Sequence, residues 1–382
     1  MRCAATSPPS ASCETQRVIR FCLVGAGFIG PLHAANIAAC PDAELAWVVD
    51  LDAAAGKALS QKYGARTTPN LGEALADARV DAVIVCTPPR THAAIIEAAA
   101  RAGKAIFCEK PIDLDLARVD ECAKTLLHSD VPFFVGFNRR FDPSHRALHD
   151  AIRSGEIGNP EMLVLSSRDP EISPPDVVAA TPWGIFYDTM IHDFDMVRWL
   201  LDDEPIEIFA RATALMNTEE NPHRDPDTAM VVLKMSRGAL VHVNSSFRAV
   251  YGYDQRIEAF GERGMLVSGN RRATTLERHD KSGMRVDPLL YFFLDRYAES
   301  YRNELADFIA AVTNRTPPSI GIDDGRRALM IAEAGVRSAK SGIPVALPAD
   351  ESKPWMRYAG MVETGDPESR RHIDDIAYGR KD

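Results

Sequence analysis

The chain has 382 residues, a length that suits two domains better than one hydrophobic core. Acidic residues outnumber basic residues 54 to 44, and the net charge of −10 argues against a general binder of nucleic acid or anionic membranes. No apolar run reaches the length of a bilayer span, so we expect no membrane association.

The first residues and the cysteines indicate the compartment. Residues 1–17 are small and polar with two prolines and no apolar signal segment, which predicts a disordered tail. The seven cysteines are odd in number and form no CxxC pair, and three of them, Cys22, Cys86 and Cys108, lie in apolar runs. This pattern predicts free thiols in a reducing compartment, the cytoplasm, and no metal site built from cysteine.

The first motif lies between Val18 and Asp50. Strand-forming residues lead into Gly25-Ala26-Gly27-Phe28-Ile29-Gly30, a helical pattern follows, and a second apolar run ends at Asp50. This order of strand, GxGxxG turn, helix, strand and acid is typical of a dinucleotide-binding unit. Gly25 permits the tight turn, Gly27 lets the backbone approach a pyrophosphate, and Gly30 lets the helix pack closely on the strand. The alternative is an ordinary glycine-rich turn between a strand and a helix.

The residue that ends the second strand indicates which cofactor binds. A carboxylate at Asp50 accepts hydrogen bonds from an adenosine ribose and repels a 2′-phosphate. No arginine or lysine stands in the five residues that follow, 51–55. The sequence therefore favours NAD over NADP.

The alternation of strands and helices continues to Val135 and predicts the first domain. We expect helices at 53–63, 71–76, 91–102 and 114–127, and strands at 82–86, 105–108 and 132–135. Short apolar strands separated by helices predict an α/β domain, a doubly wound parallel Rossmann sheet over residues 18–142, with the ligand at the carboxyl ends of the strands.

After about residue 150 the pattern changes. One helical segment at 188–201 and two later ones at 297–312 and 323–339 accompany strands spaced as an antiparallel set, at 162–167, 206–211, 230–234, 240–245, 256–260 and 265–267. We expect an α+β domain over residues 143–348 with an open, mostly antiparallel sheet. Such a sheet needs cover on one face, which implies a partner subunit. Residues 349–382 are a polar extension without a predicted structure.

Two places offer residues for acid–base chemistry. Lys110 follows a predicted strand at the ligand edge and precedes a proline, so its amine is placed to donate to a substrate hydroxyl, although a surface lysine is the alternative. Asp188 and His192 are four residues apart and share one face of the predicted helix, where the carboxylate orients a histidine base. The alternative there is a capping acid with a packed histidine.

Other charged residues have plainer interpretations. His92 is expected to cap or pack within its loop. Arg139 and Arg140 are either surface charges or residues that bind a polyol or a carboxylate. Asp193 and Asp195 are expected to be solvated or to lie in an interface.

Four segments together resemble one family. They are Gly25-Ala26-Gly27-Phe28-Ile29-Gly30, Thr87-Pro88-Pro89-Arg90-Thr91-His92, Glu109-Lys110-Pro111 and Asp188-Thr189-Met190-Ile191-His192-Asp193. The chain resembles the glucose–fructose oxidoreductase/inositol dehydrogenase/MocA family from about Val18 to Pro348. Four further segments, beginning at Asn138, Ser167, Ile191 and Tyr251, are similar to inositol 2-dehydrogenases.

The resemblance implies a role for each site residue. Lys110 contacts the reacting hydroxyl, His192 is the acid–base and Asp188 holds the geometry. The cofactor site comprises Gly25, Gly27, Phe28, Ile29, Gly30, Asp50, Thr87, Pro88, His92 and Glu109. The ring hydroxyls are contacted by Asn138, Arg139, Asp169, Thr189 and one of Tyr251 or Tyr253, with Tyr253 preferred. No metal is implied.

The resemblance also implies an activity and an assembly. The expected reaction is NAD-dependent oxidation of a cyclic polyol to a ketone, first of all myo-inositol to scyllo-inosose, by a cytoplasmic homotetramer joined through the second sheet. The alternatives are scyllo-inositol, another inositol isomer or an aldose as substrate, an inosose used in the reducing direction, and a non-catalytic sugar or dinucleotide sensor. Trp183-Gly184 stands where the family often has two glycines, which is expected to narrow the pocket.

Overall fold

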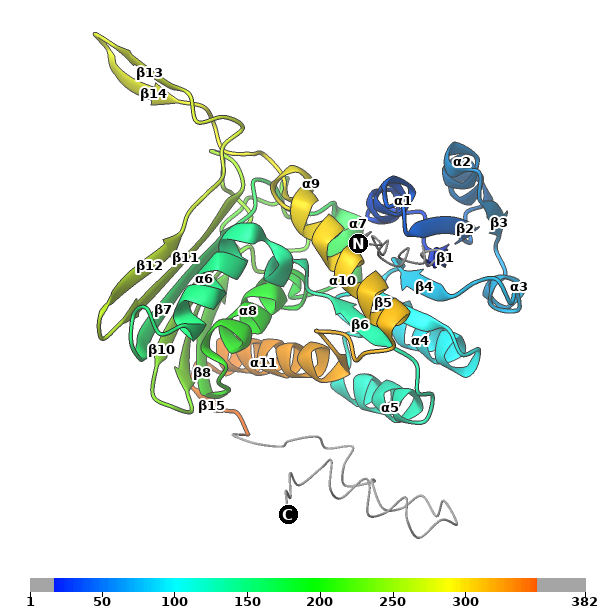
Figure 1. Ribbon diagram of the computed structural model, residues 1–382. Helices are drawn as coiled ribbons and strands as arrows, with labels where there is room; N and C mark the ends of the chain where they lie inside the picture. Colours follow the sequence, from blue (N-terminus) through cyan, green and yellow to red (C-terminus); the bar gives the residue numbers. More distant parts are fainter. Residues whose placement is uncertain (1–16, 349–382) are drawn as a thin grey trace, which may run out of the picture.

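The computed structural model describes residues 17–348. The tail expected at the N-terminus lies outside the described residues except for Arg17, and so do Cys3, Cys13 and the extension from residue 349. In the described part of the chain, the longer sheets have six and seven strands and stand beside each other with helices between them (Figure 1).

The first sheet is parallel and has the strand order β3-β2-β1-β4-β5-β6. Its strands are β1 (Ile19–Val24), β2 (Ala43–Val49), β3 (Arg66–Thr68), β4 (Ala82–Val85), β5 (Ala105–Glu109) and β6 (Phe133–Gly136). The helices that connect them are α1 (Gly30–Ala39), α2 (Ala53–Tyr63), α3 (Leu71–Leu75), α4 (His92–Arg101) and α5 (Leu116–Leu127), with a 3₁₀ turn η1 (Pro89–Thr91) before α4. The predicted Rossmann sheet is confirmed.

The strands of this sheet form because they are apolar and buried on both faces. Every residue of β4 and β5 is buried, as a sheet covered by helices on both sides requires. The short strand β3 was not predicted, because Arg-Thr-Thr has no apolar run. The carboxyl ends of β1, β2, β4 and β5 place Gly25, Asp50, Thr87 and Lys110 at one edge of the sheet.

The second sheet has the strand order β12-β11-β7-β10-β9-β8-β15. Its strands are β7 (Pro160–Arg168), β8 (Pro205–Thr213), β9 (Thr228–Met235), β10 (Leu240–Ser246), β11 (Asp254–Gly261), β12 (Gly264–Ser268) and β15 (Val345–Ala346). Every neighbouring pair is antiparallel except β7 and β10, which run parallel with Ser167 opposite Ser245. The mostly antiparallel sheet is confirmed, and the one parallel pair makes it mixed.

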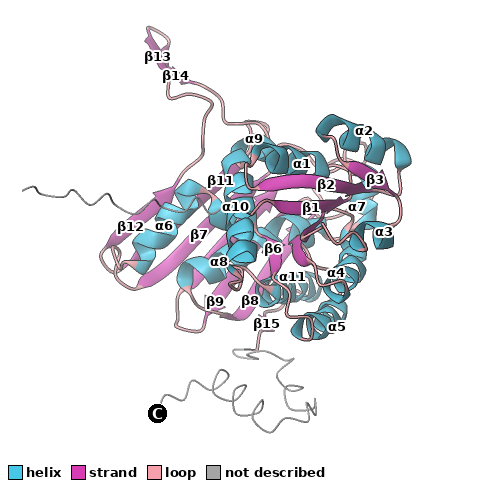
Figure 2. Ribbon diagram, turned by 45° about the vertical axis from the view of Figure 1, so that its right-hand side comes forward, coloured by secondary structure: helices cyan, strands magenta, loops and turns pink. Residues whose placement is uncertain are grey.

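Among residues 17–348, helices cover one face of the second sheet and leave the other uncovered (Figure 1). They are α6 (Pro143–Arg153), α8 (Ile191–Leu201) and α11 (Ile322–Ser341). The helix α6, the short helix α7 (Pro175–Ala180) and the hairpin β13 (Glu277–Asp280)–β14 (Gly283–Val286) were not predicted. The hairpin projects away from the body of the molecule in both ribbon views (Figures 1 and 2).

One helix from the second half of the chain packs against the first sheet. After the short helix α9 (Phe293–Arg296), α10 (Ala298–Asn314) places Phe308 within 6.2 Å of the rings of Phe21, Phe107 and Phe134, measured between ring centroids. Leu305 and Ile309 join the same core. The first sheet is therefore completed by residues that come about 170 positions after its last strand.

Two further expectations concern the described residues alone. Cys22, Cys86, Cys108 and Cys122 are buried, Cys40 is partly buried, and all five are free thiols. None of the helices between residues 17 and 348 combines the length and the apolar character that crossing a membrane requires.

Candidate active site

The glycine-rich turn has the geometry that a dinucleotide requires. Gly25 takes a φ of +102°, and a Cβ there would lie 2.7 Å from the carbonyl of Cys86. A Cβ on Gly30 would lie 2.2 Å from the carbonyl oxygen of Gly25, so only glycine lets α1 begin this close to the turn. A Cβ on Gly27 would meet no atom within 4 Å, which leaves the backbone open to a bound pyrophosphate.

The next two residues of the turn, Phe28 and Ile29, extend toward α9. Phe28 is 69% exposed, and its ring lies 6.2 Å from that of Phe292 and 5.9 Å from that of Phe293. Ile29 packs beside the buried tyrosines of the α9–α10 region. The turn therefore contacts the second half of the chain before any ligand binds.

Asp50 is held at the end of β2 with its carboxylate beside the turn. Its Oδ2 accepts from the Ala26 N–H at 2.6 Å and its Oδ1 accepts from the Asp52 N–H at 2.7 Å. Leu51 is 90% exposed and supplies no positive charge. The site thus offers an acceptor for ribose hydroxyls and no partner for a 2′-phosphate.

His92 links the two loops that follow β4 and β5. Its Nε2 lies 2.6 Å from the carbonyl oxygen of Thr87, and its Nδ1 lies 2.8 Å from that of Pro111. Burial lowers the pKa of His92, and a neutral ring has one N–H to donate. Both ring nitrogens face protein carbonyls, so a role of His92 at the cofactor would act through the positions of Thr87 and Pro111.

Lys110 and Asp188 form the central ion pair of the site. Lys110 Nζ lies 2.5 Å from Asp188 Oδ1 and donates to the Asp188 carbonyl oxygen at 2.8 Å. The side chain of Asp188 is 51% exposed and that of Lys110 is 15% exposed. The contact therefore holds the Lys110 ammonium in place and leaves the Asp188 carboxylate partly open to solvent.

The helix that carries Asp188 differs from the prediction. Residues Ile185–Met190 form a π-helical segment, labelled η3, and the α-helix α8 begins only at Ile191. A π-helical turn inserts an extra residue, and such turns are common at functional sites. In this geometry Asp188 contacts Lys110, and its carboxylate makes no hydrogen bond with His192 among the described residues. The predicted contact between Asp188 and His192 is thus replaced by one between Asp188 and Lys110.

His192 lies in the first turn of α8, beside the ring of Phe137. The two ring centroids are 5.9 Å apart and the planes meet at 79°. Its Nδ1 is buried and has no partner within the described chain. Burial lowers the pKa of His192 well below its ordinary value, and the positive charges of Lys110 and Arg139 lower it further. His192 is therefore neutral at pH 7 and able to accept a proton.

Of the residues expected to contact the substrate, some already make hydrogen bonds within the protein and others have buried polar atoms without a partner among the described residues. Arg139 is buried and donates through Nη1 to Asp193 Oδ1 at 2.8 Å and to Ser167 Oγ at 2.9 Å. Asn138 and Asp169 each carry a buried atom, Nδ2 and Oδ1 respectively, that has no partner in the described part of the chain. Burial raises the pKa of Asp169 to about 7, although the charge of Arg139 opposes the rise. Unpaired buried atoms of this kind mark places where a ligand completes the hydrogen bonding.

Two tyrosines were candidates for the same surface. Tyr253 is buried, its ring lies edge-on to Tyr297 at 6.0 Å, and Asp169 and Arg139 both act on its pKa, which burial raises well above its ordinary value. Tyr251 is half-exposed and its hydroxyl donates to Asp254 at 2.7 Å. The geometry thus favours Tyr253. Thr189 is buried between Asp188 and the start of α8.

The expectation that Asp193 and Asp195 are solvated was wrong. Both are 1% exposed. Asp193 pairs with Arg139, and Asp195 pairs with Arg140, whose Nη2 also lies 2.8 Å from Asp324. The two arginines are therefore buried charges that need these carboxylates, and neither is a surface charge.

Glu109 and Trp183 both pack against other parts of the protein. The Glu109 carboxylate is buried and its Oε1 lies 2.6 Å from His33 Nε2, inside the protein. Trp183 takes a φ of +63°, a conformation that glycine adopts readily. Its ring lies 6.0 Å from that of Phe186 and 4.9 Å from Lys340 Nζ. Trp183 therefore packs on the core of the second sheet. The contact of His33 with Glu109 was not predicted, because no motif in the sequence contains both residues.

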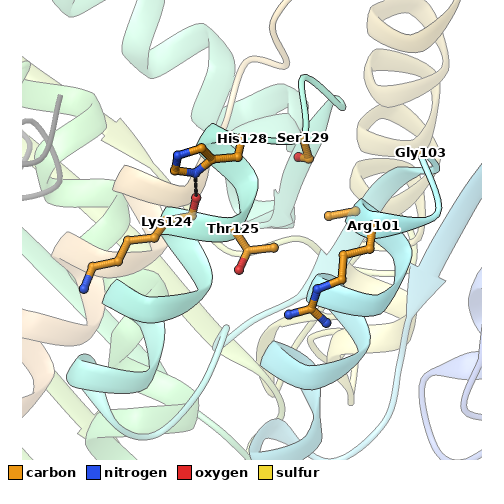
Figure 3. A pocket seen from close by; sticks show the side chains of 7 residues that line it. Arg101, Gly103, Lys124, Thr125, His128 and Ser129 are labelled. Carbon is orange, nitrogen blue, oxygen red and sulfur yellow. Dashed lines mark hydrogen bonds between the residues drawn. The ribbon is translucent and has the colours of Figure 1, made fainter. Parts of the chain in front are cut away.

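A surface hollow lies at the edge of the first sheet opposite to Lys110, Asp188 and His192. That hollow has a volume of about 610 Å³ and lies at the ends of α4 and α5 (Figure 3). It is lined by Ala100, Arg101, Gly103, Lys124, Thr125, His128 and Ser129. It contains none of the predicted site residues.

Comparison with known proteins agrees with this geometry. Residues 19–137 match the model of an oxidoreductase family with an NAD-binding Rossmann fold, and residues 145–267 match the GFO/IDH/MocA C-terminal domain. The chain is 44% identical over 321 residues to inositol 2-dehydrogenase of Rhizobium meliloti (strain 1021), covering 84% of this chain and 96% of that one. It is 41% identical over 330 residues to myo-inositol 2-dehydrogenase of Thermotoga maritima, covering 86% and 98%.

A solved structure gives the same result for the fold. Myo-inositol dehydrogenase from Lactobacillus casei, in complex with NAD(H) and myo-inositol, superimposes with a TM-score of 0.81 at 26% identity. The match covers 88% of this chain and 99% of that one.

Proposed function

The chain belongs to the GFO/IDH/MocA oxidoreductase family, and we propose that it oxidises one ring hydroxyl of myo-inositol to give the ketone scyllo-inosose, with NAD as cofactor. The observation that carries the proposal is a set of unpaired polar atoms in the region that contains Lys110, whose charge acts on Asp169 and His192. Asn138 Nδ2, Asp169 Oδ1 and His192 Nδ1 are buried and have no hydrogen-bond partner among residues 17–348. A polyol has a donor and an acceptor on every carbon and can pair with all three.

The residues present fit NAD. Gly25, Gly27 and Gly30 form the turn for the pyrophosphate, the first turn of α1 presents its N–H groups, and Asp50 accepts from the ribose. NAD supplies the hydride acceptor when it is bound. The protein supplies the orientation and the acid–base groups.

The proton is handled by His192 and the developing charge by Lys110. His192 is neutral, so a ring nitrogen can take the proton of the reacting hydroxyl. The Lys110 ammonium then faces the alkoxide oxygen and stabilises its charge. Asp188 holds the ammonium in place through its carboxylate and its carbonyl oxygen. Arg139, Asp169, Thr189 and Tyr253 orient the other ring hydroxyls.

Substrate and cofactor can be tested together. The purified protein is assayed for NAD reduction with myo-inositol, scyllo-inositol, chiro-inositol and glucose, and the series is repeated with NADP. We expect the highest kcat/KM for myo-inositol with NAD. A higher value for another polyol would overturn the substrate, and tight NAD binding without turnover of any polyol would indicate a sensor.

We also infer a homotetramer joined through the uncovered face of the second sheet. Alternation along the strands places seven large apolar side chains on that face, each between 43% and 59% exposed: Met162, Met230, Val232, Leu240, Phe260, Met265 and Val267. An apolar face of this kind is typical of an interface. Val232→Glu should lower the mass measured by light scattering, whereas Val177→Glu on α7, also 46% exposed, should not. An unchanged mass for Val232→Glu would overturn the assignment of this face.

We place the enzyme in the cytoplasm, because its cofactor and its reduced thiols belong to that compartment. Fractionation of cells that express the tagged chain would test the location. Recovery in an oxidising compartment would overturn it.

A further inference from the structure

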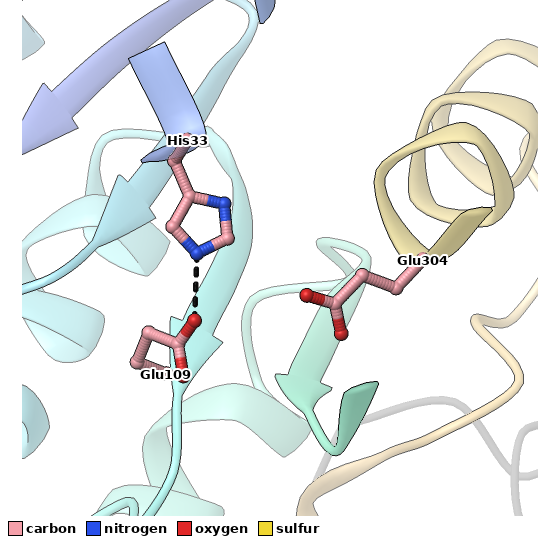
Figure 4. Close-up of side chains that lie close together, drawn as sticks. All are labelled: His33, Glu109 and Glu304. Atoms are coloured by element: carbon pink, nitrogen blue, oxygen red, sulfur yellow. Dashed lines mark hydrogen bonds and ion pairs between the residues drawn. The ribbon is translucent and has the colours of Figure 1, made fainter. Parts of the chain in front are cut away.

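Three ionisable residues from distant parts of the chain meet inside the protein (Figure 4). His33 comes from α1, Glu109 from the end of β5 and Glu304 from α10. One nitrogen or oxygen atom of each lies within 4.8 Å of the others. His33 and Glu304 are 0% exposed and Glu109 is 7% exposed. The cluster therefore joins the helix after the nucleotide turn, the strand that carries Lys110 and the helix that completes the first sheet.

The cluster has more acidic groups than partners for them. Glu109 pairs with His33 Nε2, but neither oxygen of Glu304 has a hydrogen-bond partner in the described chain, and neither has His33 Nδ1. The ring of Tyr301 lies 5.9 Å from that of His33. A tyrosine carries no positive charge, so this neighbour does not balance the charge of the two carboxylates. An unpaired carboxylate in such surroundings is unfavourable, and a proton or a cation would remove that cost.

The distances favour a proton over a metal ion. His33 Nε2 and Glu109 Oε1 are 2.6 Å apart, the distance of a short hydrogen bond. Two ligands of one Zn²⁺ or Mg²⁺ ion lie farther apart, about 2.9–3.4 Å, given metal–ligand distances of about 2.0–2.1 Å. The pair is thus closed on itself and does not surround an ion.

We propose that Glu304 is held as a neutral carboxylic acid and acts as a positioning residue, linking α1, β5 and α10 around the His33–Glu109 pair so that the nucleotide turn and Lys110 keep their places. The proton comes from solvent and stays on Glu304 when the protein folds. As an acid, Glu304 has one O–H to donate, and the acceptors in the cluster are the Glu109 carboxylate and the Nδ1 of His33, which has no partner among the described residues. One atom of each residue lies within 4.8 Å of the others, and within residues 17–348 Glu304 is not already hydrogen-bonded to either acceptor.

The electrostatic surroundings support the neutral form. Burial raises the pKa of Glu304 well above its ordinary value, and the charge of Glu109 raises it further. The titratable groups around it are His33 on α1, Glu109 on β5, Tyr301 on α10 and Cys86 after β4. Burial raises the pKa of Tyr301 and of Cys86 as well, so both are neutral at pH 7.

Thermal unfolding tests the protonation state without any substrate. A carboxyl group whose pKa is raised by folding stabilises the protein fully at low pH, and that contribution is lost as pH rises through the folded pKa. Glu304→Gln keeps the shape of the neutral acid and does not titrate. We expect its Tm to match the wild type at pH 5 and to exceed it by a few degrees at pH 8.

Glu299→Gln on the same helix is the matched control, since Glu299 is 46% exposed. Its Tm difference from the wild type should not grow with pH in this way. If Glu304→Gln were destabilised by the same amount at pH 5 and pH 8, Glu304 would be ionised in the folded protein and the proposal would be overturned.

Turnover tests the positioning role, and this readout rests on the proposed function. Glu304→Gln should keep kcat within about threefold of the wild type, whereas Glu304→Ala should lower kcat about tenfold or more and raise the KM for NAD. Equal losses in both variants would overturn the role of the neutral acid. Co-purification of a metal with the wild-type chain, together with loss of Tm on chelation, would assign the cluster to a cation and overturn the proposal also.

Discussion

Lys110 Nζ and Asp188 Oδ1 are 2.5 Å apart, although the two residues are separated by 78 positions in the sequence. Lys110 directly follows strand β5 of the first sheet, and Asp188 lies in the π-helical segment η3. The contact fixes the end of β5 against the π-helical segment η3, where the two halves of the chain meet. A polyol that binds beside Lys110 therefore meets an ammonium whose position is already set, which reduces the cost of orienting it during the reaction.

Replacement of Lys110 by alanine should lower kcat on the order of 10²-fold, because the alkoxide loses its cation. The Kd for NAD should change little, since the dinucleotide is held by the turn at Gly25–Gly30 and by Asp50. Steady-state kinetics and NAD titration measure the two effects. Lys62→Ala at the far end of α2 is the control and should behave as the wild type. Near-normal turnover of the Lys110 variant would remove Lys110 from the mechanism.

Asp50→Ser combined with Leu51→Arg should move the cofactor preference toward NADP. The change removes the carboxylate that repels a 2′-phosphate and adds a cation at a position that is 90% exposed. The measurement is the ratio of kcat/KM with NAD to that with NADP. A wild-type protein that already prefers NADP would contradict this interpretation of Asp50.

Asp169→Asn should stabilise the protein at pH 8 while it weakens the binding of the polyol. Folding raises the pKa of Asp169 to about 7, so the wild type loses stability as pH rises from about 4 to about 7, and asparagine does not. The Tm difference between variant and wild type should therefore grow with pH across that window. The KM for myo-inositol should rise about tenfold, because a charged acceptor is lost.

Asp176→Asn, at an exposed position in α7, is the control for this experiment. It should show neither effect. A Tm difference that is the same at pH 5 and pH 8 would mean that Asp169 is ionised throughout, and an unchanged KM would place it outside the substrate site.

The parts of the site that follow from local sequence were predictable. Gly25, Gly30 and Asp50 lie at the ends of apolar strands, and the role of each depends on its immediate neighbours. The parts that depend on distant partners were not predictable. Asp193 looks like a solvated residue until Arg139, 54 positions earlier, is seen to need a buried counter-charge. The cluster of His33, Glu109 and Glu304 joins three elements, and each residue alone looks ordinary.

The fold shows the same division. The repeating strands and helices predicted the parallel sheet, but the parallel pairing of β7 with β10 was not predicted, because the residues buried in succession near the ends of both strands include serines and an asparagine and so form no apolar run. The π-helical segment η3 was missed for a related reason. Its apolar residues fit a normal helix, and the extra residue is stabilised by tertiary contacts such as the one between Asp188 and Lys110.

His192 determines how oxidation should depend on pH. Its pKa lies well below the ordinary value of 6.5, because of burial and then because of the charges of Lys110 and Arg139. A base must be neutral to accept a proton, so kcat/KM should rise with pH through that lowered pKa, and the acidic limb should lie below pH 6.5. A second inflection near pH 7 should belong to Asp169 and should disappear in Asp169→Asn.

His192→Ala should lower kcat by about 10²-fold or more and should remove the acidic limb, since the remaining route must use water or Lys110. His128→Ala, at the far end of α5, should keep both the rate and the profile. Lys110 and Asp188 lie near His192, so a fitted value belongs to the coupled group, and the loss of the limb is the more direct test. If His192→Ala kept both the wild-type rate and the wild-type pH profile, the base would lie elsewhere, and Lys110 would become the leading candidate.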